Sequence, residues 1–396
     1  MKISFYGGAR EVTGACFLLE TERTKILIDC GLFQGSRELS AANNEPFPFS
    51  PKDIDAVLVT HAHVDHVGRI PKLVAGGFHG TIFSAPGTRD LARLLLQDAL
   101  HLAERSDQAL STPQDVEQAL SLWQDVPYGG RRTIGDMVFT LHNAGHILGS
   151  AMIVLEAEGK KILHTGDLGN NPSVLLPPPE YFSDIEYMLI ESTYGNMAHE
   201  APGERTLKLE RAVEDTVARG GTLMIPAFAA ERTQDILHLL NEMLLYKRIP
   251  DVPVFVDSPL AIRITEVYEH YPDAYRPEIR ELFARHRHLF RSKKLHFTET
   301  AEQSKAISHT QGAKIIIAGS GMLQGGRILH HLRQYLSDEK SMLLIVGFQA
   351  AGSLGRRLVE GADRVRIFNE DVSVRAEIRK INGFSAHADL PQLFDF

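Results

Sequence analysis

The sequence is poor in cysteine and has no long apolar run. Its two cysteines, Cys16 and Cys30, form no Cys-x-x-Cys pair. That rules out a disulfide framework and fits a reducing compartment. No stretch is long and apolar enough to span a bilayer, and residues 1–5 lead directly into an expected strand without a signal-peptide pattern. We therefore expect a soluble, cytoplasmic protein with no membrane partner.

An excess of positive charge is also missing. The net charge of −8 argues against a protein that holds nucleic acid by bulk electrostatics. It does not exclude a local basic groove, and bound divalent metal ions would add positive charge where they sit. The rest of the composition is ordinary for a globular protein, with 43% hydrophobic and 23% charged residues. A length of 396 residues favours about two or three domains.

The sequence does contain a dense group of metal-binding side chains at residues 60–68, Thr-His-Ala-His-Val-Asp-His-Val-Gly. This group follows an apolar, β-branched run that predicts a buried strand. Its candidate ligands are His61, His63, Asp65 and His66. These residue types suit zinc, but one binding sphere rarely takes four ligands from so short a loop. We interpret them as two half-sites side by side, in preference to a polar loop with chance histidines.

Three further polar residues lie beside glycines in expected turns. His146 is flanked by two glycines, whose unobstructed backbone lets an imidazole approach a metal closely. Asp167 lies in a Thr-Gly-Asp-Leu-Gly turn after an expected strand, and Asp29 ends a buried strand just before a glycine, Gly31. Alone, these residues would be a core histidine and turn aspartates. Downstream of the histidine loop, His146 and Asp167 complete a ligand pattern, whereas His164 is interpreted as structural.

Apolar spacing indicates how the elements alternate along the chain. It predicts helices over residues 86–105, 113–126, 207–219 and 235–246. Expected strands at residues 221–228 and 252–261 alternate with the later helices. Such alternation implies a small parallel sheet with helices on its faces.

Residues 60–68 resemble the signature of the metallo-β-lactamase superfamily. The resemblance implies Zn2+ as the cofactor, bound at two sites. The first metal would be held by His61, His63 and His146, and the second by Asp65 and His66, with Asp167 bridging both. The resemblance also implies that Asp29 braces the metal loop through hydrogen bonds.

Four later stretches resemble the β-CASP group of nucleases within that superfamily. They are residues 191–195, 225–234, 257–261 and 380–389, so the resemblance covers nearly the whole chain. It implies an α/β fold: an αββα metallo-β-lactamase sandwich with an inserted α/β β-CASP domain. The expected bounds are 1–199 for the first part of the metallo-β-lactamase domain, 200–375 for the β-CASP domain and 376–396 for the return to the first domain.

Two other stretches bear on substrate binding. Residues 270–311 are rich in Arg, His and Lys, including Arg276, Arg280, Arg285, Arg287, Arg291, Lys293 and Lys294. A solvated helix surface and a basic wall of a nucleic-acid cleft both stay open for them. Residues 314–336 are an expected strand, glycine-rich loop and helix, but the glycine spacing departs from the dinucleotide fingerprint. A backbone phosphate of nucleic acid fits this loop better, with Arg327 beside it.

The β-CASP resemblance implies hydrolysis of RNA phosphodiester bonds, as in ribonucleases similar to the nuclease subunit of the cleavage and polyadenylation specificity factor and its bacterial and archaeal relatives. Asp65 would orient the nucleophile and accept its proton. Glu191 would fix the tautomer of His387, which would protonate the leaving 3′-oxygen or hold the scissile phosphate. Single-stranded RNA would lie between the two domains, as the substrate of an endonuclease and 5′-exonuclease. The expected substrate-binding residues are Ser385, Arg232, Gly321 and Arg327.

Two other functions stay open. An Artemis-like DNA nuclease would share Asp65, His66 and Asp167, although the Ser-Thr-Tyr-Gly and Phe-Ser-Ala-His-Ala-Asp sequences are more similar to the RNA branch. The second is a catalytically inactive RNA-binding protein on the same fold. The complete ligand set argues against it, and a metal-binding assay would separate the two. A homodimer also stays open.

The end of the sequence carries a further expectation. Ribonucleases of this resemblance have another strand-end histidine beyond the Phe-Ser-Ala-His motif, and none follows His387 here. Leu390, Leu393 and Phe394 have helical spacing, and the expected helix reaches Phe396 without a cap. We expect the natural protein to continue and the second metal site to be incomplete in this chain. Metal analysis would then give nearer one tightly held zinc than two.

Overall fold

A computed structural model of the chain describes residues 1–105, 108–286, 288–350 and 352–396. The chain divides into two compact units. Unit 1 comprises Met1–Asn196 and His387–Phe396, and unit 2 comprises Met197–Ala386. The sequence led us to expect the return to the first domain at residue 376. Unit 2 instead continues to Ala386, because residues 377–380 form the last strand of its own sheet.

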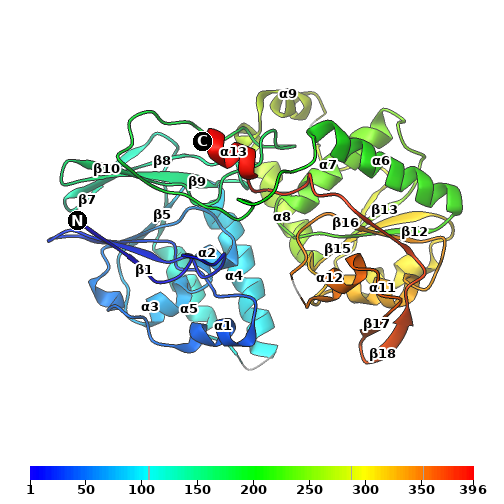
Figure 1. Ribbon diagram of the computed structural model, residues 1–396, viewed down its shortest axis with the longest axis horizontal. Helices are drawn as coiled ribbons and strands as arrows, with labels where there is room; N and C mark the ends of the chain where they lie inside the picture. The colour runs from blue at the N-terminus through cyan, green and yellow to red at the C-terminus, as the bar shows by residue number, and fades with distance from the viewer. Residues whose placement is uncertain (106–107, 287, 351) are drawn as a thin grey trace. The chain divides into compact units, whose positions relative to one another are not determined.

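Two β-sheets form the centre of unit 1 (Figure 1). The first sheet is antiparallel from β1 to β3 and parallel from β3 to β6. In order its strands are β1 (Lys2–Phe5), β2 (Phe17–Glu20), β3 (Lys25–Ile28), β4 (Ala56–Leu58), β5 (Thr81–Ser84) and β6 (Trp123–Asp125). The second sheet is antiparallel except for one parallel pair, residues 160–164 with residues 187–189. In order its strands are β11 (Tyr187–Leu189), β10 (Lys160–His164), β9 (Ala151–Ala157), β8 (Met137–Asn143) and β7 (Arg131–Ile134).

Apolar side chains of both sheets meet in one core. Side chains alternate across a strand, so each sheet turns one row of large residues toward the other. From the first sheet these include Phe17, Leu19, Ile26, Ile28 and Leu58, and from the second Phe139, Leu141, Ile153, Leu155 and Ile162. This packed core holds still the strand ends from which the candidate ligands extend.

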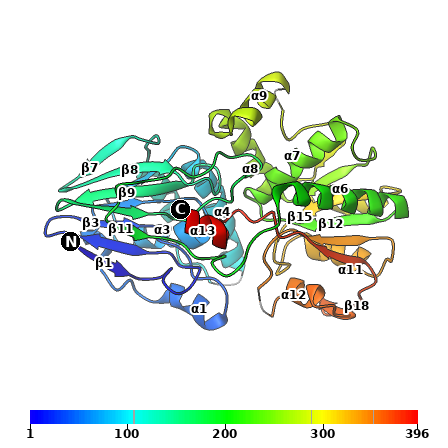
Figure 2. The same ribbon diagram turned by 45° about the horizontal axis from the view of Figure 1, so that its top comes forward.

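Helices complete the layers of unit 1. Figure 1 shows α3 (Ile70–Ala75), α4 (Thr88–Arg105) and α5 (Pro113–Ser121) beside the first sheet, on the side away from the second. The short helices α1 (Arg37–Ala41) and α2 (Val64–Val67) lie in connections of the same unit. On the outer face of the second sheet, Leu393 of α13 (Leu390–Asp395) packs against a cluster that contains Met152 and Leu163 (Figure 2). The expected αββα order is confirmed, with a thin second helical layer.

One predicted helix is shorter than expected. The apolar spacing predicted a helix over residues 113–126, but α5 ends at Ser121 and Trp123–Asp125 form β6, the edge strand of the first sheet. Ile82 and Trp123 are partners in the parallel pairing of β5 with β6, and the Trp123 indole N–H donates to Ser84 Oγ over 2.8 Å. Pairing with the sheet therefore overrides the helical spacing that continues past residue 121.

Unit 2 is built on a six-stranded parallel sheet. In order its strands are β14 (Leu295–Phe297), β13 (Val254–Asp257), β15 (Lys314–Ala318), β12 (Thr222–Pro226), β16 (Met342–Ile345) and β19 (Glu377–Lys380). The central strands β12, β15 and β16 are buried along their whole length, as expected when helices cover both faces of a parallel sheet. Figure 1 shows α6 (Pro202–Arg219) and α7 (Arg232–Leu245) on one face, and α11 (Ile328–Tyr335) and α12 (Leu354–Val359) on the other.

The remaining elements of unit 2 are α8 (Pro259–His270), α9 (Pro277–His286), α10 (Ala301–Ala306) and a hairpin of β17 (Arg364–Ile367) with β18 (Glu370–Ser373). Because neighbouring parallel strands end at the same edge of a sheet, the loops that follow β12, β13, β15, β16 and β19 share one edge. Among the described residues, no helix combines the length and the apolar character needed to cross a membrane.

Candidate metal centre

The histidine loop connects the end of β4 to α2, and neighbouring strand ends fix its backbone. The Cys30 N–H donates to the His66 carbonyl over 2.8 Å, and the Ala15 N–H donates to the Asp65 carbonyl over 2.9 Å. Gly31 lies so close to Asp65 that an added Cβ would stand 1.5 Å from that carbonyl oxygen. Glycine is therefore required at residue 31 for the loop to pack against the first sheet.

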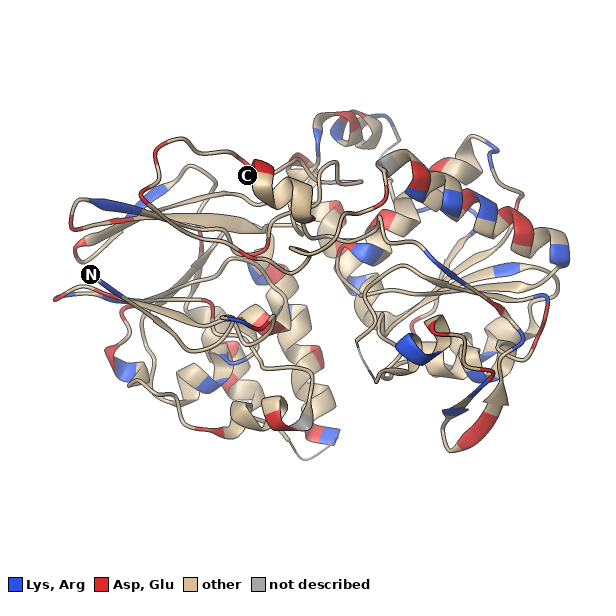
Figure 3. Ribbon diagram, in the orientation of Figure 1, with Lys and Arg blue, Asp and Glu red and all other residues tan. Residues whose placement is uncertain are grey.

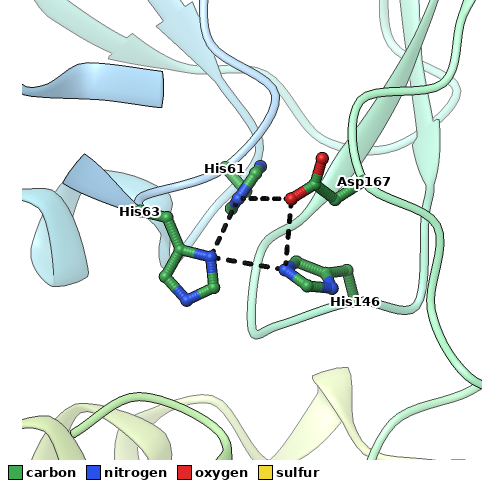
Figure 4. Close-up of side chains that lie close together, drawn as sticks. All are labelled: His61, His63, His146 and Asp167. Atoms are coloured by element: carbon green, nitrogen blue, oxygen red, sulfur yellow. Dashed lines mark hydrogen bonds and ion pairs between the residues drawn. The ribbon is translucent and has the colours of Figure 1, made fainter. Parts of the chain in front are cut away.

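Four candidate ligands gather on this loop and on two loops of the second sheet. Figure 4 shows His61, His63, His146 and Asp167 with their polar atoms facing one another. His61 Nε2 is 3.0 Å from His63 Nδ1 and 3.5 Å from Asp167 Oδ2. His146 Nε2 is 3.3 Å from His63 Nδ1 and 3.6 Å from Asp167 Oδ2. All four ligand atoms lie within 4.8 Å of one another.

The spacing of these four atoms fits a tetrahedral ion. A zinc ion with bonds of about 2.0–2.2 Å needs neighbouring donors about 3.3–3.6 Å apart. Imidazole nitrogens must also be neutral to bind a metal. Burial, followed by the nearby His66, lowers the pKa of His61 well below its usual range. Burial also lowers the pKa of His63 to about 4, so both rings are neutral at neutral pH. The donor set therefore suits a metal ion of the zinc type.

Asp29 supports the histidine loop through hydrogen bonds, as the family resemblance led us to expect. Its carboxylate is fully buried and accepts hydrogen bonds from the Thr60 N–H over 2.8 Å and the Thr60 hydroxyl over 2.7 Å. It also accepts from His66 Nδ1 over 2.7 Å. That bond fixes the tautomer of His66 and leaves Nε2 to face Asp167, 3.6 Å away. Sequence reasoning assigned no role to Thr60, although it begins the motif.

The charges within the centre depend on one another. Burial lowers the pKa of His66, but the carboxylates of Asp167 and Asp29 outweigh it and raise that pKa to about 10. Burial raises the pKa of Asp167 to about 6, opposed by the positive charges of His66 and His387. Without a metal ion, the Asp167 carboxylate therefore interacts with two imidazolium groups, those of His66 and His387.

Glu191 and His387 meet in space although 196 residues separate them. His387 Nδ1 is 3.2 Å from both carboxylate oxygens of Glu191 and 3.9 Å from Asp167 Oδ2. Two isolated β-bridges join the returning chain to unit 1: Gly169 with His387, and Tyr194 with Asp389. The Leu168 N–H also donates to Glu191 Oε1 over 2.6 Å, which links the carboxylate to the loop that carries Asp167.

The pair of Glu191 and His387 also shifts its own protonation. Burial lowers the pKa of His387, but the Glu191 carboxylate outweighs it and raises that pKa to about 9. Burial raises the pKa of Glu191, but the positive charge of His387 outweighs it and holds that pKa below its usual range. Asp167, Glu191 and His387 form a second group with ligand atoms within 4.8 Å.

The expected second set of ligands is less complete. His66 approaches Asp167, and the negative charge of Asp65 acts on His63, His387 and Asp167. Among the described residues, however, neither compact group of ligand atoms includes Asp65 or His66. His164, interpreted as structural, is buried with its ring edge-on to Phe17 at 4.6 Å. Its Nδ1 accepts from the Gly166 N–H over 3.1 Å.

The four expected substrate-binding residues all lie in unit 2, and three of them have internal roles. Arg232 is 6% exposed and stands over the Phe384 ring at 5.8 Å. Arg327 Nη1 donates to Asp257 Oδ1 over 2.7 Å and to the Thr298 carbonyl over 2.9 Å. Gly321 is buried, and an added Cβ would stand 2.8 Å from the ring of Phe228. Gly321 thus offers a substrate no surface, because Phe228 covers it; Ser385 is half-buried.

The basic stretch at residues 270–311 carries matching acidic groups. Arg285 pairs with Glu281 at 3.3 Å, Arg291 with Glu269 at 2.8 Å, and Lys294 with Asp251 at 2.9 Å. Figure 3 shows both signs of charge along α9. Arg287 lies outside the described residues. The pairing favours a solvated helix surface over a basic wall.

Two family models match the sequence. One, described as the metallo-beta-lactamase superfamily, matches residues 9–226, and one described as the Beta-Casp domain matches residues 233–358. The first match runs beyond Asn196 into β12 of unit 2. Ligand positions from His61 to Asp167 lie within the first match, and Arg232 and His387 lie outside both.

Curated relatives align with the whole chain. Ribonuclease TTHA0252 of Thermus thermophilus is 39% identical over 396 residues, which cover 100% of this chain and 90% of the relative. An RNase J-like protein of Methanocaldococcus jannaschii is 34% identical over 397 residues, covering 99% and 88%. Transcription termination factor FttA of the same organism is 33% identical over 409 residues, covering 100% and 64%. A crystal structure of a protein of unknown function from Enterococcus faecalis shares the fold, with a TM-score of 0.53 at 11% identity over 98% of this chain and 88% of that one.

Proposed function

The chain belongs to the metallo-beta-lactamase superfamily and carries its Beta-Casp domain, and from that membership we propose that it is a metal-dependent ribonuclease that hydrolyses RNA phosphodiester bonds. Relatives that align over the whole chain and bear the names ribonuclease and RNase J-like protein support RNA as the substrate. The same relatives favour RNA over the DNA of an Artemis-like nuclease.

The observation that carries this proposal is the pairing of two groups around Asp167. His61, His63, His146 and Asp167 have the spacing of a tetrahedral metal site, and Glu191 and His387 lie against the same carboxylate. An inactive fold has no need to keep both groups complete. We assign zinc to the first group, with His66 and Asp65 directed to a second ion. When bound, such ions supply a water-derived nucleophile at neutral pH and offset the charge of the phosphate.

The chain's own residues then have distinct tasks in hydrolysis. The Asp65 carboxylate orients the attacking water and accepts its proton. The Glu191 carboxylate accepts a hydrogen bond from His387 Nδ1–H and so fixes the orientation of the ring. Nε2 of His387 is left to carry a proton for the substrate. The water oxygen forms the new bond to phosphorus while the bond to the 3′-oxygen breaks. His387 Nε2 gives its proton to that leaving oxygen, which leaves a 3′-hydroxyl and a 5′-phosphate.

The direct test is cleavage of end-labelled and circular single-stranded RNA by the 396-residue chain loaded with zinc. Asp65→Ala is expected to abolish cleavage without unfolding the protein, because it removes a metal ligand and the acceptor of the water's proton. His387→Ala is expected to keep its metal content and to lower kcat by about a hundredfold or more, the usual contribution of acid–base catalysis. Cleavage of circular RNA would establish endonuclease action, and release of nucleotides from a 5′ end would establish exonuclease action.

His142→Ala is the matched control, because His142 also pairs with a glutamate, Glu180, at 2.9 Å but lies outside the centre. It should cleave RNA like the wild type. A His387→Ala protein that cleaves at the wild-type rate would remove the role given to His387. Wild-type protein that binds little zinc and cleaves neither RNA nor DNA of the same sequence would favour an inactive binding protein. Cleavage of DNA alone would favour the Artemis-like function.

A further inference from the structure

Two exposed phenylalanines lie at the edge of unit 2 where its parallel strands end. Phe228 follows β12 by two residues, and Phe348 follows β16 by three. Strand β12 pairs with both β15 and β16, so their loops are neighbours at this edge. Ligands of open α/β sheets bind at the carboxyl edge of the strands. The exposed fraction of Phe228 is 40% and that of Phe348 is 57%, which is high for the largest apolar side chains.

The Phe228 ring is partly exposed, and hydrogen bonds fix the backbone that carries it. Its carbonyl accepts from the Thr233 hydroxyl over 2.7 Å, and the preceding Ala227 N–H donates to Ala318 over 3.1 Å. One part of the ring covers Gly321: a Cβ on that glycine would come within 2.8 Å of it. A Cβ on Gly347 would stand 3.6 Å from the same ring. Two glycines from different loops, Gly321 and Gly347, therefore pack against the Phe228 ring, where any larger residue would add a side chain.

A buried glutamine ties those two loops together. Gln349 is 4% exposed, and its amide donates to the Gly321 carbonyl over 2.8 Å and to the Gly347 carbonyl over 3.4 Å. Phe348 stands between Gly347 and Gln349, so its backbone is fixed by the same contacts. The Phe228 ring and the backbone that carries Phe348 are thus positioned before any ligand arrives, which reduces the entropy cost of binding.

The charge of this edge fits a polyanion. The chain as a whole has a net charge of −8. Yet among the described residues of the loops after β12, β15, β16 and β19, both carboxylates, Glu231 and Asp389, are buried. Lys380, the exposed last residue of β19, supplies positive charge at this edge, whereas the charge of Arg327 is paired with Asp257. Polar side chains such as Ser320 and the exposed Gln324 lie in the loop beside Phe228 and can reach the edges of a base.

We propose that Phe228 and Phe348 form a base-stacking platform for single-stranded RNA. Aromatic side chains stack on unpaired bases with little regard to sequence, whereas the bases of a duplex stay stacked inside it. The platform rests on the proposed ribonuclease function, and it adds to it two named residues that hold unpaired bases outside the metal centre. Phe228, which sequence reasoning did not single out, replaces Gly321 as the residue of this edge that meets substrate.

The test measures binding separately from cleavage. The zinc-loaded protein is titrated into a phosphorothioate RNA of about ten nucleotides, a length within the range of single-strand sites, that carries one 2-aminopurine. Stacking on Phe228 or Phe348 should quench the 2-aminopurine fluorescence. Phe228→Leu and Phe348→Leu should each raise Kd by about fivefold or more, the effect of losing one base–aromatic contact. Phe228→Tyr, which keeps the ring, should bind like the wild type.

Phe368→Leu is the matched control, because Phe368 is 45% exposed on the same unit but lies in the turn of the β17–β18 hairpin. Its Kd and quenching should not change. A duplex of the same sequence should bind no more weakly to the Leu variants than to the wild type. The platform is overturned if the folded Phe348→Leu variant and the double variant Phe228→Leu/Phe348→Leu keep the wild-type Kd and quenching. That result would favour a protein, in place of RNA, as the partner of this surface. If the wild type never cleaves RNA but the Leu variants lose the quenching that the wild type shows, the proposed function is overturned and the platform stands.

Discussion

At the scale of single residues, Asp29 is the residue on which most of the centre's geometry depends. It has a left-handed backbone with φ of +58°, a conformation that L-residues other than asparagine and aspartate rarely adopt. The strain is offset by the hydrogen bonds that its buried carboxylate accepts from Thr60 and His66. One side chain thus sets both the path of the histidine loop and the ring orientation of a candidate ligand.

We therefore predict that Asp29→Asn weakens metal binding without abolishing folding. The amide can accept at one oxygen but turns an NH2 group toward Thr60 or His66, so one ligand ring loses its fixed tautomer. Loss of such a supporting partner typically lowers metal affinity by about 10- to 100-fold. Competition with a fluorescent zinc chelator would measure the change.

Asp55→Asn makes the same chemical change at another carboxylate that accepts from backbone, here the Lys25 N–H over 2.8 Å. It should leave zinc affinity as in the wild type. Equal zinc affinity in the Asp29 and Asp55 variants would show that Asp29 supports the fold and not the metal.

The residue scale also shows what the sequence could and could not predict about the centre. Residue type and position marked His61, His63, His146 and Asp167 as candidate ligands, whereas their assignment to one ion came from the family resemblance. The pairing of Glu191 with His387 required a family resemblance, since no local pattern links residues so far apart. Burial of Gly321 under Phe228 could not be predicted, because it depends on the packing of loops from three strands.

At the scale of elements, a buried aspartate at the end of one strand of unit 2 binds side chains from two helices. Asp257 ends β13 and is fully buried. It accepts from Arg327, which precedes α11, from His331 within α11 over 2.7 Å, and from Ser304 of α10 over 2.6 Å. The loop after β15 is therefore anchored at its far end by a charge network and not by apolar packing alone.

This network predicts how acid affects unit 2. Burial would raise the pKa of Asp257, but hydrogen bonds from His331, Ser304, Thr298 and Arg327 outweigh it and hold that pKa well below its usual range. A carboxyl whose pKa is depressed in the folded state contributes stability above its unfolded pKa of about 3.9, and that contribution is lost as the pH falls below it. Asp257→Asn should thus be less stable by about 3 kcal/mol at pH 7.

Denaturant unfolding of both proteins at a series of pH values would measure this effect. The difference in stability between wild type and Asp257→Asn should shrink steadily as the pH falls from about 5 toward 2. The exposed Asp184, which pairs with Lys161 at 2.5 Å, provides Asp184→Asn as the control with a small and nearly constant difference. A difference for Asp257→Asn that stays constant with pH would show that its charge does not stabilise the fold.

Elements were predictable where local pattern and pairing agree. The helix over residues 86–105 was indicated by apolar spacing, and α4 spans Thr88–Arg105. The prediction for residues 113–126 was wrong at its end, since the edge of the first sheet takes Trp123–Asp125 as a strand. A similar long-range pairing draws residues 377–380 into the sheet of unit 2 and moves the unit boundary to Ala386. Both differences come from contacts between distant parts of the chain, which periodicity does not report.

At the scale of the whole molecule, the two units differ in what stabilises them. The candidate metal ligands among the described residues, on the histidine loop and at His146 and Asp167, lie in unit 1, as does the pair of Glu191 and His387. The four ligand atoms lie within 4.8 Å of one another, and part of their hydrogen-bonding capacity stays unused unless a cation joins them. Unit 2 has its own apolar core around Met224, Ile316 and Leu343, and among its described residues no group of candidate metal ligands was found.

Removal of metal should therefore loosen unit 1 alone. An ion that binds only the folded unit stabilises it by about 4 kcal/mol when its free concentration is a thousandfold above Kd. Addition of a chelator should accordingly raise amide hydrogen exchange in the loops that carry His61–His66, His146 and Asp167, read peptide by peptide in a mass spectrometer. Exchange in β12 and β15 should stay unchanged, and the same chelator saturated with zinc should have no effect on either unit. If exchange rises equally in both units, or stays constant in the three ligand loops, the metal centre does not stabilise unit 1 and the ligand assignment loses its main structural consequence.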